Sequence, residues 1–346
     1  MINKVGFFRH TPSGCFWYRI KNPMDMFKAN GIGTEFIELD KDINDFDNIK
    51  TFQFYGAVPF SFEKIFEFLK KENKKIIYDA DDALDYIDES NPFYFSVKKD
   101  LGSANMAIEY ADELTVSTPE MKKYMETKTS KPITVVPNCY VPSEWAFPRP
   151  KREGIRIGFA GSATHVQDLI DIVPIIRKLQ TKYPITFIIM GFGMSDYKSW
   201  YKDFRYTAPL LAQKQLEELD KALEGMEFEW VSYVDYDKYP SSLINMALDI
   251  GLCPLKDTPF NRCRSACKAM EYTLAGAVAL ASDVAPYRNE ATSVLVKDGD
   301  WEDAIELMCK HPDVRKNFND AARTWLEENR KVDSQLVTLK RVYDIM

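Results

Sequence analysis

Short apolar runs rich in β-branched residues alternate with longer amphipathic segments along this 346-residue chain. Such alternation is typical of parallel sheets covered by helices. The alternation occurs twice, and we expect strands at residues 4–9, 34–39, 51–55, 75–79, 113–117 and 133–136, then at 155–160, 185–190, 228–231, 249–254, 277–282 and 293–296. Helices are expected at residues 61–71, 97–111, 119–126, 167–181, 211–223, 241–246, 265–275 and 301–310.

A proline-rich stretch separates the two series. It contains Pro137, Pro142, Pro148 and Pro150, and because proline fixes φ and lacks an N–H donor, the stretch cannot be helix or central strand. The length suits two domains of about 150 residues each. We therefore predict an α/β protein of two Rossmann-like, doubly wound domains that face each other across a cleft. The expected parts are an N-terminal domain at 1–140, a linker at 141–153, a C-terminal domain at 154–320, and a helix at 321–346 that packs back toward the N-terminal domain.

The composition narrows the function classes. A net charge of −7 and a pI near 5.3 do not give the positive field of non-specific nucleic-acid binders. No apolar run approaches the ~20 residues that span a bilayer, so we expect a cytoplasmic protein without a transmembrane segment. The six cysteines form no CxxC pair, and Cys263 and Cys267 have no histidine nearby, so no zinc site is expected.

The segment after the first expected strand, RHTPSGCFWYR, is expected to be a turn. Gly14 would let the backbone approach a ligand, and Arg9 and Arg19 could offer charge to an anion. A purely structural turn is an equally good interpretation.

The segment IGFAGSATHVQDL opens the second series. Gly161 and Ser162, between a strand and a helix, could bring the backbone against a phosphate at a helix N-terminus. The segment is not GxGxxG and lacks the P-loop lysine, which disfavours a dehydrogenase or an NTPase. His165 and Asp168 could join this site; alternatively, Asp168 favours the helix dipole and His165 is exposed.

A polar loop and helix follow the expected strand at 249–254. The loop carries Arg262 and Arg264, and Ser265, Lys268 and Glu271 recur along the helix at intervals of three residues. Helix-end amides with Arg or Lys would bind a diphosphate, and a carboxylate suits the two hydroxyls of a ribose. A solvated helix face is the alternative interpretation.

Several of these segments resemble the retaining GT-B glycosyltransferases of the family-4 type, which include bacterial and phage sugar transferases. The resemblance covers most of the chain and rests on FNRCRSACKAMEYTLAG, IGFAGSATHVQDL, YDADDAL, ADELTVSTPEMKKY and VVPN, in that family's order. It implies the GT-B fold and transfer of a sugar from a nucleoside-diphosphate sugar, UDP- or GDP-linked, to an acceptor hydroxyl with retention of configuration. It also implies front-face attack assisted by the leaving diphosphate, without a protein nucleophile and without a required metal or cofactor.

The resemblance also implies residue roles. Glu271 would bind the donor ribose, Lys268 would lie near the diphosphate, and Gly14 and Gly161 would approach donor and sugar. Cys263 stands where the family often has the first of two glutamates, so a contact to the donor sugar is missing or comes from elsewhere. The full expectation is catalytic Arg262, Lys268 and Asp81; donor-binding Gly161, Ser162, His165, Arg264, Ser265 and Glu271; and acceptor-side Gly14, Arg19 and Asp82, with no metal ligand.

The acceptor stays open at this point. A glycan, a lipid-linked sugar or a modified base in phage DNA would each offer a hydroxyl, and the acidic total charge disfavours nucleic acid. The aromatic and cationic stretch at 193–215 could recognise an acceptor or form a lid helix that buries its aromatic rings.

Three other functions compete. Asp79 and Asp81 form a DxD that could hold Mn²⁺ or Mg²⁺ in a metal-dependent, GT-A-like transferase. A two-domain nucleotide-sugar epimerase would share the predicted architecture. A non-catalytic sugar-nucleotide-binding protein would also fit, with Cys263 marking lost catalysis.

Overall fold

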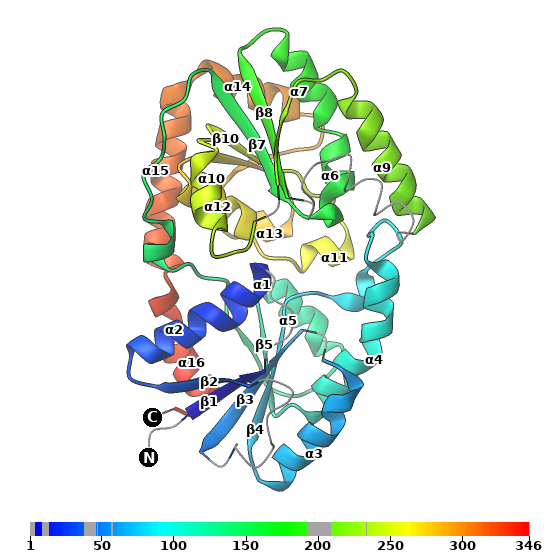
Figure 1. The fold of residues 1–346 in the computed structure, drawn as a ribbon, viewed down its shortest axis with the longest axis vertical. Helices are drawn as coiled ribbons and strands as arrows, with labels where there is room; N and C mark the ends of the chain where they lie inside the picture. Colours follow the sequence, from blue (N-terminus) through cyan, green and yellow to red (C-terminus); the bar gives the residue numbers. More distant parts are fainter. Residues whose placement is uncertain are drawn as a thin grey trace.

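The computed structural model describes residues 4–8, 14–37, 46, 48–56, 58–191, 209–232 and 234–345. Figure 1 shows two lobes, each a twisted sheet flanked by helices. All strand pairs within both sheets are parallel. The predicted two-sheet α/β architecture is confirmed.

The first sheet has six strands in the order β2-β1-β3-β4-β5-β6. Its strands are β1 (Lys4–Phe8), β2 (Gly33–Ile37), β3 (Ile49–Tyr55), β4 (Lys75–Ala80), β5 (Glu113–Val116) and β6 (Ile133–Val135). Its helices are α1 (Gly14–Phe16), a π-helical turn (Trp17–Lys21), α2 (Asn22–Ala29), α3 (Glu63–Lys71), α4 (Tyr94–Tyr110) and α5 (Pro119–Glu126).

The second sheet has six strands in the order β12-β11-β10-β7-β8-β9. Its strands are β7 (Ile155–Gly161), β8 (Ile185–Gly191), β9 (Glu229–Val231), β10 (Ile250–Cys253), β11 (Val278–Ser282) and β12 (Val294–Val296). The helices that accompany it are α6 (Val166–Ile170), α7 (Val173–Gln180), α9 (Leu210–Leu223), α10 (Tyr239–Asn245), α11 (Pro259–Arg262), α12 (Cys267–Leu274), α13 (Ala285–Arg288), α14 (Trp301–Lys310) and α15 (Pro312–Asn329). A final helix, α16 (Leu336–Val342), follows.

Every expected strand is present, with ends within two residues of the predicted ones. Two helical predictions were wrong. The segment expected to be a turn around Gly14 and Arg19 is helical, because α1, the π-helical turn and α2 run on without a break. The single helix expected at 167–181 is two helices, since Pro174 at the start of α7 has no N–H to donate to the preceding turn.

The strand orders place one switch point in each sheet. In the first sheet the chain leaves β1 toward β2 on one side and later fills β3 on the other; in the second sheet β7 separates β8 from β10 in the same way. Open parallel sheets bind ligands outside the carboxyl ends of their strands at such points. The segments that follow β1, β3, β7 and β10 are therefore the places to look for a site.

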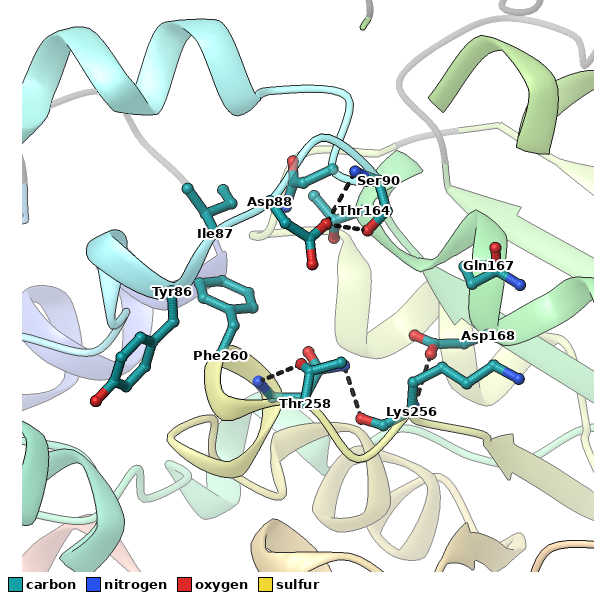
Figure 2. A pocket seen from close by; sticks show the side chains of 12 residues that line it. Tyr86, Ile87, Asp88, Ser90, Thr164, Gln167, Asp168, Lys256, Thr258 and Phe260 are labelled. Atoms are coloured by element: carbon teal, nitrogen blue, oxygen red, sulfur yellow. Dashed lines mark hydrogen bonds between the residues drawn. The ribbon is translucent and has the colours of Figure 1, made fainter. Parts of the chain in front are cut away.

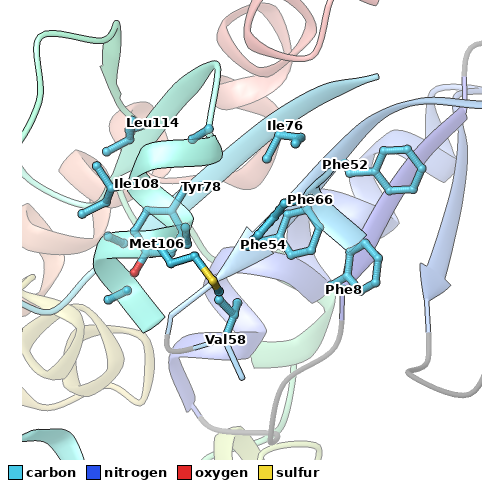
Figure 3. Packing of buried hydrophobic residues seen from close by; sticks show 14 of the residues in the cluster. Phe8, Phe52, Phe54, Val58, Phe66, Ile76, Tyr78, Met106, Ile108 and Leu114 are labelled. Carbon is cyan, nitrogen blue, oxygen red and sulfur yellow. The ribbon is translucent and has the colours of Figure 1, made fainter. Parts of the chain in front are cut away.

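Aromatic side chains dominate the core of the first half (Figure 3). The rings of Phe8 and Phe54 stack with centroids 4.2 Å apart, and Phe66 packs 4.6 Å from Phe54. After α15 the chain returns to this half, where Tyr343 packs against Phe7. The amphipathic helices predicted from sequence thus cover a continuous apolar interior.

The two halves each insert a side chain into the other. Tyr18, from the first half, packs in the apolar cluster beneath α10 and α12. Cys263, from the second half, packs in the aromatic cluster of the first half, and Thr118 donates a hydrogen bond to its carbonyl oxygen at 2.9 Å. These insertions fix how the loop before α12 meets the first half.

A buried ion pair ties the π-helical turn to the first sheet. Arg19 Nη2 lies 2.7 Å from Asp79 Oδ1, and both side chains are at most 3% exposed. Gln53 Nε2 donates to Asp79 Oδ2 at 2.7 Å, and the Tyr343 hydroxyl donates to the side-chain oxygen Oε1 of Gln53. Arg19 Nη1 donates to the Val136 carbonyl oxygen. Strands β3 and β4, the end of β6 and the C-terminal segment therefore meet at one guanidinium–carboxylate pair.

Replacing Arg19 with methionine should destabilise the protein strongly. The change would leave the Asp79 carboxylate buried without its cation, which typically costs about 3–5 kcal/mol. Urea denaturation followed by tryptophan fluorescence measures the effect. Arg262→Met is the matched control, because Arg262 pairs with Asp257 on the exposed surface and its loss should leave the midpoint unchanged. Equal midpoints for both variants would contradict the structural role given to Arg19.

Candidate active site

The clearest site lies at the head of β7, opposite the start of α12. A Cβ atom placed on Gly161 would lie 3.1 Å from Lys268 Nζ, so the absent side chain keeps the backbone open beside the ammonium group. Glycine is the residue that permits such an approach. The exposed Ser162 accompanies it, with its Oγ 2.7 Å from Thr164 Oγ1. The structure brings Gly161 and Lys268, two of the predicted site residues, next to each other.

Lys268 carries a buried charge, on which the carboxylates of Asp168 and Glu271 act without a direct ion pair within the described residues. Its Nζ is shielded from solvent and has no hydrogen-bond partner among the described residues. The ammonium group lies 4.3 Å from the centre of the Phe159 ring, a cation–π contact that stabilises it only in part. Burial lowers the pKa of Lys268 to about 8, with nearby Cys253 opposing the shift. A buried cation of this kind is a binding point for an anion.

His165 forms a second part of the site. The side chain is buried, and its Nδ1 lies 2.8 Å from Asp168 Oδ2. Because a carboxylate only accepts, Nδ1 holds the proton and Nε2 is left as an acceptor. Burial, reinforced by the charges of Lys268 and Arg264, lowers the pKa of His165 to about 3, so the imidazole is neutral. The alternative that His165 is exposed was wrong.

Glu271 is bound by two tyrosines. Tyr18 donates to Oε1 at 2.8 Å and Tyr239 donates to Oε2 at 2.9 Å. Burial raises the pKa of Glu271, and these two hydrogen bonds and the charge of Lys268 oppose the rise. The carboxylate is thereby oriented by both halves of the molecule.

The sequence analysis missed both tyrosines. Tyr18 stands 253 residues from Glu271 and is turned toward it by the π-helical turn, a feature without a spacing signal. π-helical turns recur at functional sites. Tyr239 is the first residue of α10, between Lys238 and Pro240. Nothing in this local sequence indicates that its hydroxyl would reach Glu271.

The cationic residues before α12 differ in their surroundings. Arg264 is half-buried, with its guanidinium 5.7 Å from the Phe260 ring, and its charge acts on Lys268 and His165. Arg262 is exposed and donates to Asp257 at 2.7 and 3.0 Å. Of the two arginines, Arg264 is therefore the one beside Lys268.

Ser265 takes part in a contact between the halves. Its Oγ accepts a hydrogen bond from Asn138 Nδ2 at 3.0 Å, and the same amide donates to Cys267 Sγ at 3.0 Å. Asn138 also accepts from Arg19 Nη1 at 3.2 Å. The start of α12 is thus connected to the buried ion pair of the first half.

The expected acceptor-side residues lie at the facing edge of the first sheet. Asp81 Oδ2 accepts from Tyr55 at 3.0 Å. Burial and the Asp81 charge raise the pKa of Asp82 to about 6, and the charge of Arg264 from the second half opposes that shift. Gly14 faces the second half too, since a Cβ placed on it would lie 3.8 Å from the Tyr236 ring. Arg19, in contrast, is buried in its ion pair with Asp79, so its guanidinium does not face the second half.

Known structures share the fold of this chain. The sequence matches no protein family and no curated protein. A glycosyltransferase from Rickettsia africae has a TM-score of 0.69 at 11% identity, with 99% of this chain and 97% of that chain covered. Anabaena HepE (Alr3699), in complex with UDP and glucose, has a TM-score of 0.65 at 10% identity, with 98% and 100% covered. The chain has the GT-B glycosyltransferase fold.

A third GT-B structure is that of an alpha-glucosyltransferase (AGT) in complex with UDP. Its TM-score is 0.66 at 10% identity, and 99% of each chain is covered. The same enzyme is also described with UDP-glucose and DNA containing an abasic site. At this level of identity the likeness establishes the fold of the present chain.

The GT-B fold and the surroundings of Asp79 count against the metal-dependent GT-A-like alternative. The Asp79 oxygens accept from Arg19 and Gln53, so this carboxylate is not presented to a metal. The described residues contain no group of three or more His, Cys, Asp or Glu side chains that could hold a metal ion. Within the same residues, no helix is long and apolar enough to cross a membrane. The aromatic stretch from 193 to 208 lies outside the described residues, and 210–215 begin α9.

Diphosphate binding should depend on the protonation of Lys268. Its ammonium group is charged below its lowered pKa of about 8 and loses that charge as the pH rises further. The diphosphate group of UDP has lost its last proton by about pH 7, so the charge of that group is constant above that point. We expect UDP affinity to fall about tenfold between pH 8 and pH 9.5.

Isothermal titration across this pH range tests the dependence. His165, with a pKa of about 3, and Asp82, with a pKa of about 6, complete their titrations below it. The Lys268→Met variant should bind UDP more weakly and lose clearly less affinity across this range than wild type, since only ionisation of the uracil ring then remains. A wild-type affinity that does not change with pH would remove Lys268 from the anion site.

Proposed function

We propose that this chain is a glycosyltransferase that moves a sugar from a nucleoside-diphosphate sugar to an acceptor hydroxyl with retention of configuration. The observation that carries the proposal is the unpartnered Lys268 ammonium beside Gly161, with the oriented Glu271 carboxylate one turn further along α12. The UDP and glucose bound by HepE, a protein of the same fold, support a UDP-sugar as donor. The resemblance to family-4 transferases supports retention.

The second half, residues 154–320, holds the donor in this proposal. Lys268 and Arg264 meet the diphosphate, aided by the amides at the start of α12. Gly161 and Ser162 bring the end of β7 against the same group. Glu271 accepts hydrogen bonds from the ribose hydroxyls. Each of its carboxylate oxygens then accepts from a ribose hydroxyl as well as from Tyr18 or Tyr239. Residues 1–140 face the acceptor, 141–153 link the halves, and 321–346 return to the first half.

Catalysis would come from stabilising the leaving group. As the bond between sugar and diphosphate breaks, negative charge grows on the diphosphate, and preorganised cations lower the energy of that state. His165 is neutral and adds no cation to this group, but its Nε2 can accept a hydrogen bond from a hydroxyl of the donor. The acceptor hydroxyl attacks from the side that the diphosphate leaves, and a diphosphate oxygen takes its proton.

Removing either charged donor contact should weaken donor binding. Lys268→Ala and Glu271→Ala should each raise the dissociation constant of the donor by about tenfold or more, because a lost charged hydrogen bond costs about 1.5–3 kcal/mol. Thermal shifts with UDP-, GDP-, ADP- and CMP-sugars first identify the donor. Lys316→Ala, an exposed lysine paired only with Asp320, is the control and should bind the donor like wild type. Unchanged donor binding in both site variants would defeat the proposal.

Transfer should persist after the protein is dialysed against EDTA. The reason is that Asp79, the first carboxylate of the DxD, is already bonded to Arg19 and Gln53. Radiolabelled donor with and without acceptor provides the measurement. Loss of transfer that Mg²⁺ or Mn²⁺ restores would revive the metal-dependent alternative. Appearance of an epimer from donor alone would indicate an epimerase, and tight donor binding without transfer or hydrolysis would indicate a binding protein.

A further inference from the structure

A pocket lies between the two halves, next to the donor site. It contains about 540 Å³ of empty space, a figure that includes open solvent at its mouth. Figure 2 shows its walls. The first half contributes Tyr86, Ile87, Asp88, Ser90 and Asn91, and the second half contributes Thr164, Gln167, Asp168, Lys256, Thr258, Phe260 and Asn261.

Two residues that line the pocket contact the proposed donor-binding residues. Asp168 is hydrogen-bonded to His165, and the charges of Lys268 and Arg264 contribute to the lowered pKa of that imidazole. Phe260 lines the opposite side, and its ring lies against the Arg264 guanidinium. A molecule in the pocket would therefore lie beside the group that Lys268 and Arg264 bind.

The polar groups of the pocket are mostly neutral and have hydrogen-bonding capacity to spare. Asn261 Nδ2 donates to the Lys256 carbonyl oxygen at 2.9 Å, which leaves its own oxygen available. Asn91 Oδ1 accepts from the Phe93 amide at 2.9 Å, which leaves its NH₂ group available. The Gln167 amide has no hydrogen bond within the described part of the chain. Amides of this kind both donate and accept, as sugar hydroxyls require.

The charges of the pocket disfavour an anionic occupant. Lys256 is the cation of the lining, and its Nζ is paired with Asp171. Asp88 and Asp168 are both acidic, and Asp88 accepts from the Ser90 amide at 2.9 Å. A nucleic acid brings phosphates that need free Lys or Arg side chains. This wall offers carboxylates in their place.

Aromatic faces complete the lining. Tyr86 is 43% exposed, although its ring also packs 5.1 Å from Tyr124. Phe260 is half-buried and lies on the same side of the pocket as Tyr86 (Figure 2). A flat apolar ring face beside neutral amides suits the C–H face of a sugar ring, whose edge carries hydroxyls.

We propose that this pocket is the acceptor subsite and that it takes an uncharged sugar ring, so the acceptor is a carbohydrate hydroxyl. The proposal rests on the proposed transferase function. It adds Tyr86, Gln167 and Asn261 as acceptor-binding residues, and it selects a glycan over a base in DNA.

Acceptor kinetics test the proposal. With the identified donor, glucose, galactose, N-acetylglucosamine, maltose, lactose and a short single-stranded DNA are offered as acceptors. Gln167→Ala and Tyr86→Ala should each raise the acceptor KM about fivefold. The donor KM and the slow hydrolysis of donor without acceptor should stay within about twofold of wild type. Phe318→Ala, an exposed aromatic residue on α15, should change neither constant.

Some outcomes would overturn the proposal. The proposal is wrong if the enzyme transfers sugar to DNA and to none of the sugars. It is also wrong if both variants keep the wild-type acceptor KM, or if their donor KM rises as much as their acceptor KM. Saturation-transfer NMR with the same sugars, without donor, separates this failure from that of the transferase function. If wild type neither binds nor cleaves any nucleotide sugar, the transferase function fails, while sugar signals lost in Tyr86→Ala would still identify the pocket. Sugar signals equal in wild type and both variants would reject the pocket itself.

Discussion

The Arg19–Asp79 ion pair is the interaction on which the arrangement of the site depends. It joins the π-helical turn to β4, and through Gln53 and Tyr343 it also holds β3 and the C-terminal segment. A buried guanidinium that makes several hydrogen bonds has one geometry, since each lost bond leaves a desolvated charge. The residue before Arg19 is Tyr18, which reaches Glu271 in the other half. The core of the first half thereby determines the orientation of a carboxylate in the second.

The two charged groups of the site differ in their hydrogen bonds. The Glu271 carboxylate accepts from two tyrosine hydroxyls, whereas the Lys268 ammonium, which lies against the Phe159 ring, forms no hydrogen bond within the described residues. An anion would complement the buried ammonium group, which agrees with the proposed binding of a diphosphate. Because the surrounding dipoles and side chains are already positioned, little reorganisation accompanies the growth of charge on a leaving group.

The sequence was sufficient to predict the strands because buried parallel strands are apolar runs, and it grouped Gly161, Lys268 and Glu271 because strand ends and helix spacing are local features. It failed where partners are distant. The helical run from Gly14 was read as a turn, since Gly14 resembles a turn residue and the π-helical turn has no periodic signal. Arg19 looked like an anion ligand, but its partner Asp79 lies 60 residues away. The contact of Tyr18 with Glu271 joins the two halves, so only the folded structure reveals it.

Cys263 shows how assembly limits the chemistry of one position. Its thiol points into the first half, where it lies 3.9 Å from the Glu120 carbonyl oxygen within an aromatic and aliphatic cluster. A glutamate in this conformation would bury a charge among apolar groups and would be driven toward its protonated form. The halves can therefore meet closely here because position 263 is uncharged. A carboxylate nevertheless acts nearby, since the charge of Asp82 contributes to the raised pKa of the Cys263 thiol, after burial and Glu120. The carboxylates whose charge reaches position 263, Glu120 and Asp82, both belong to the first half.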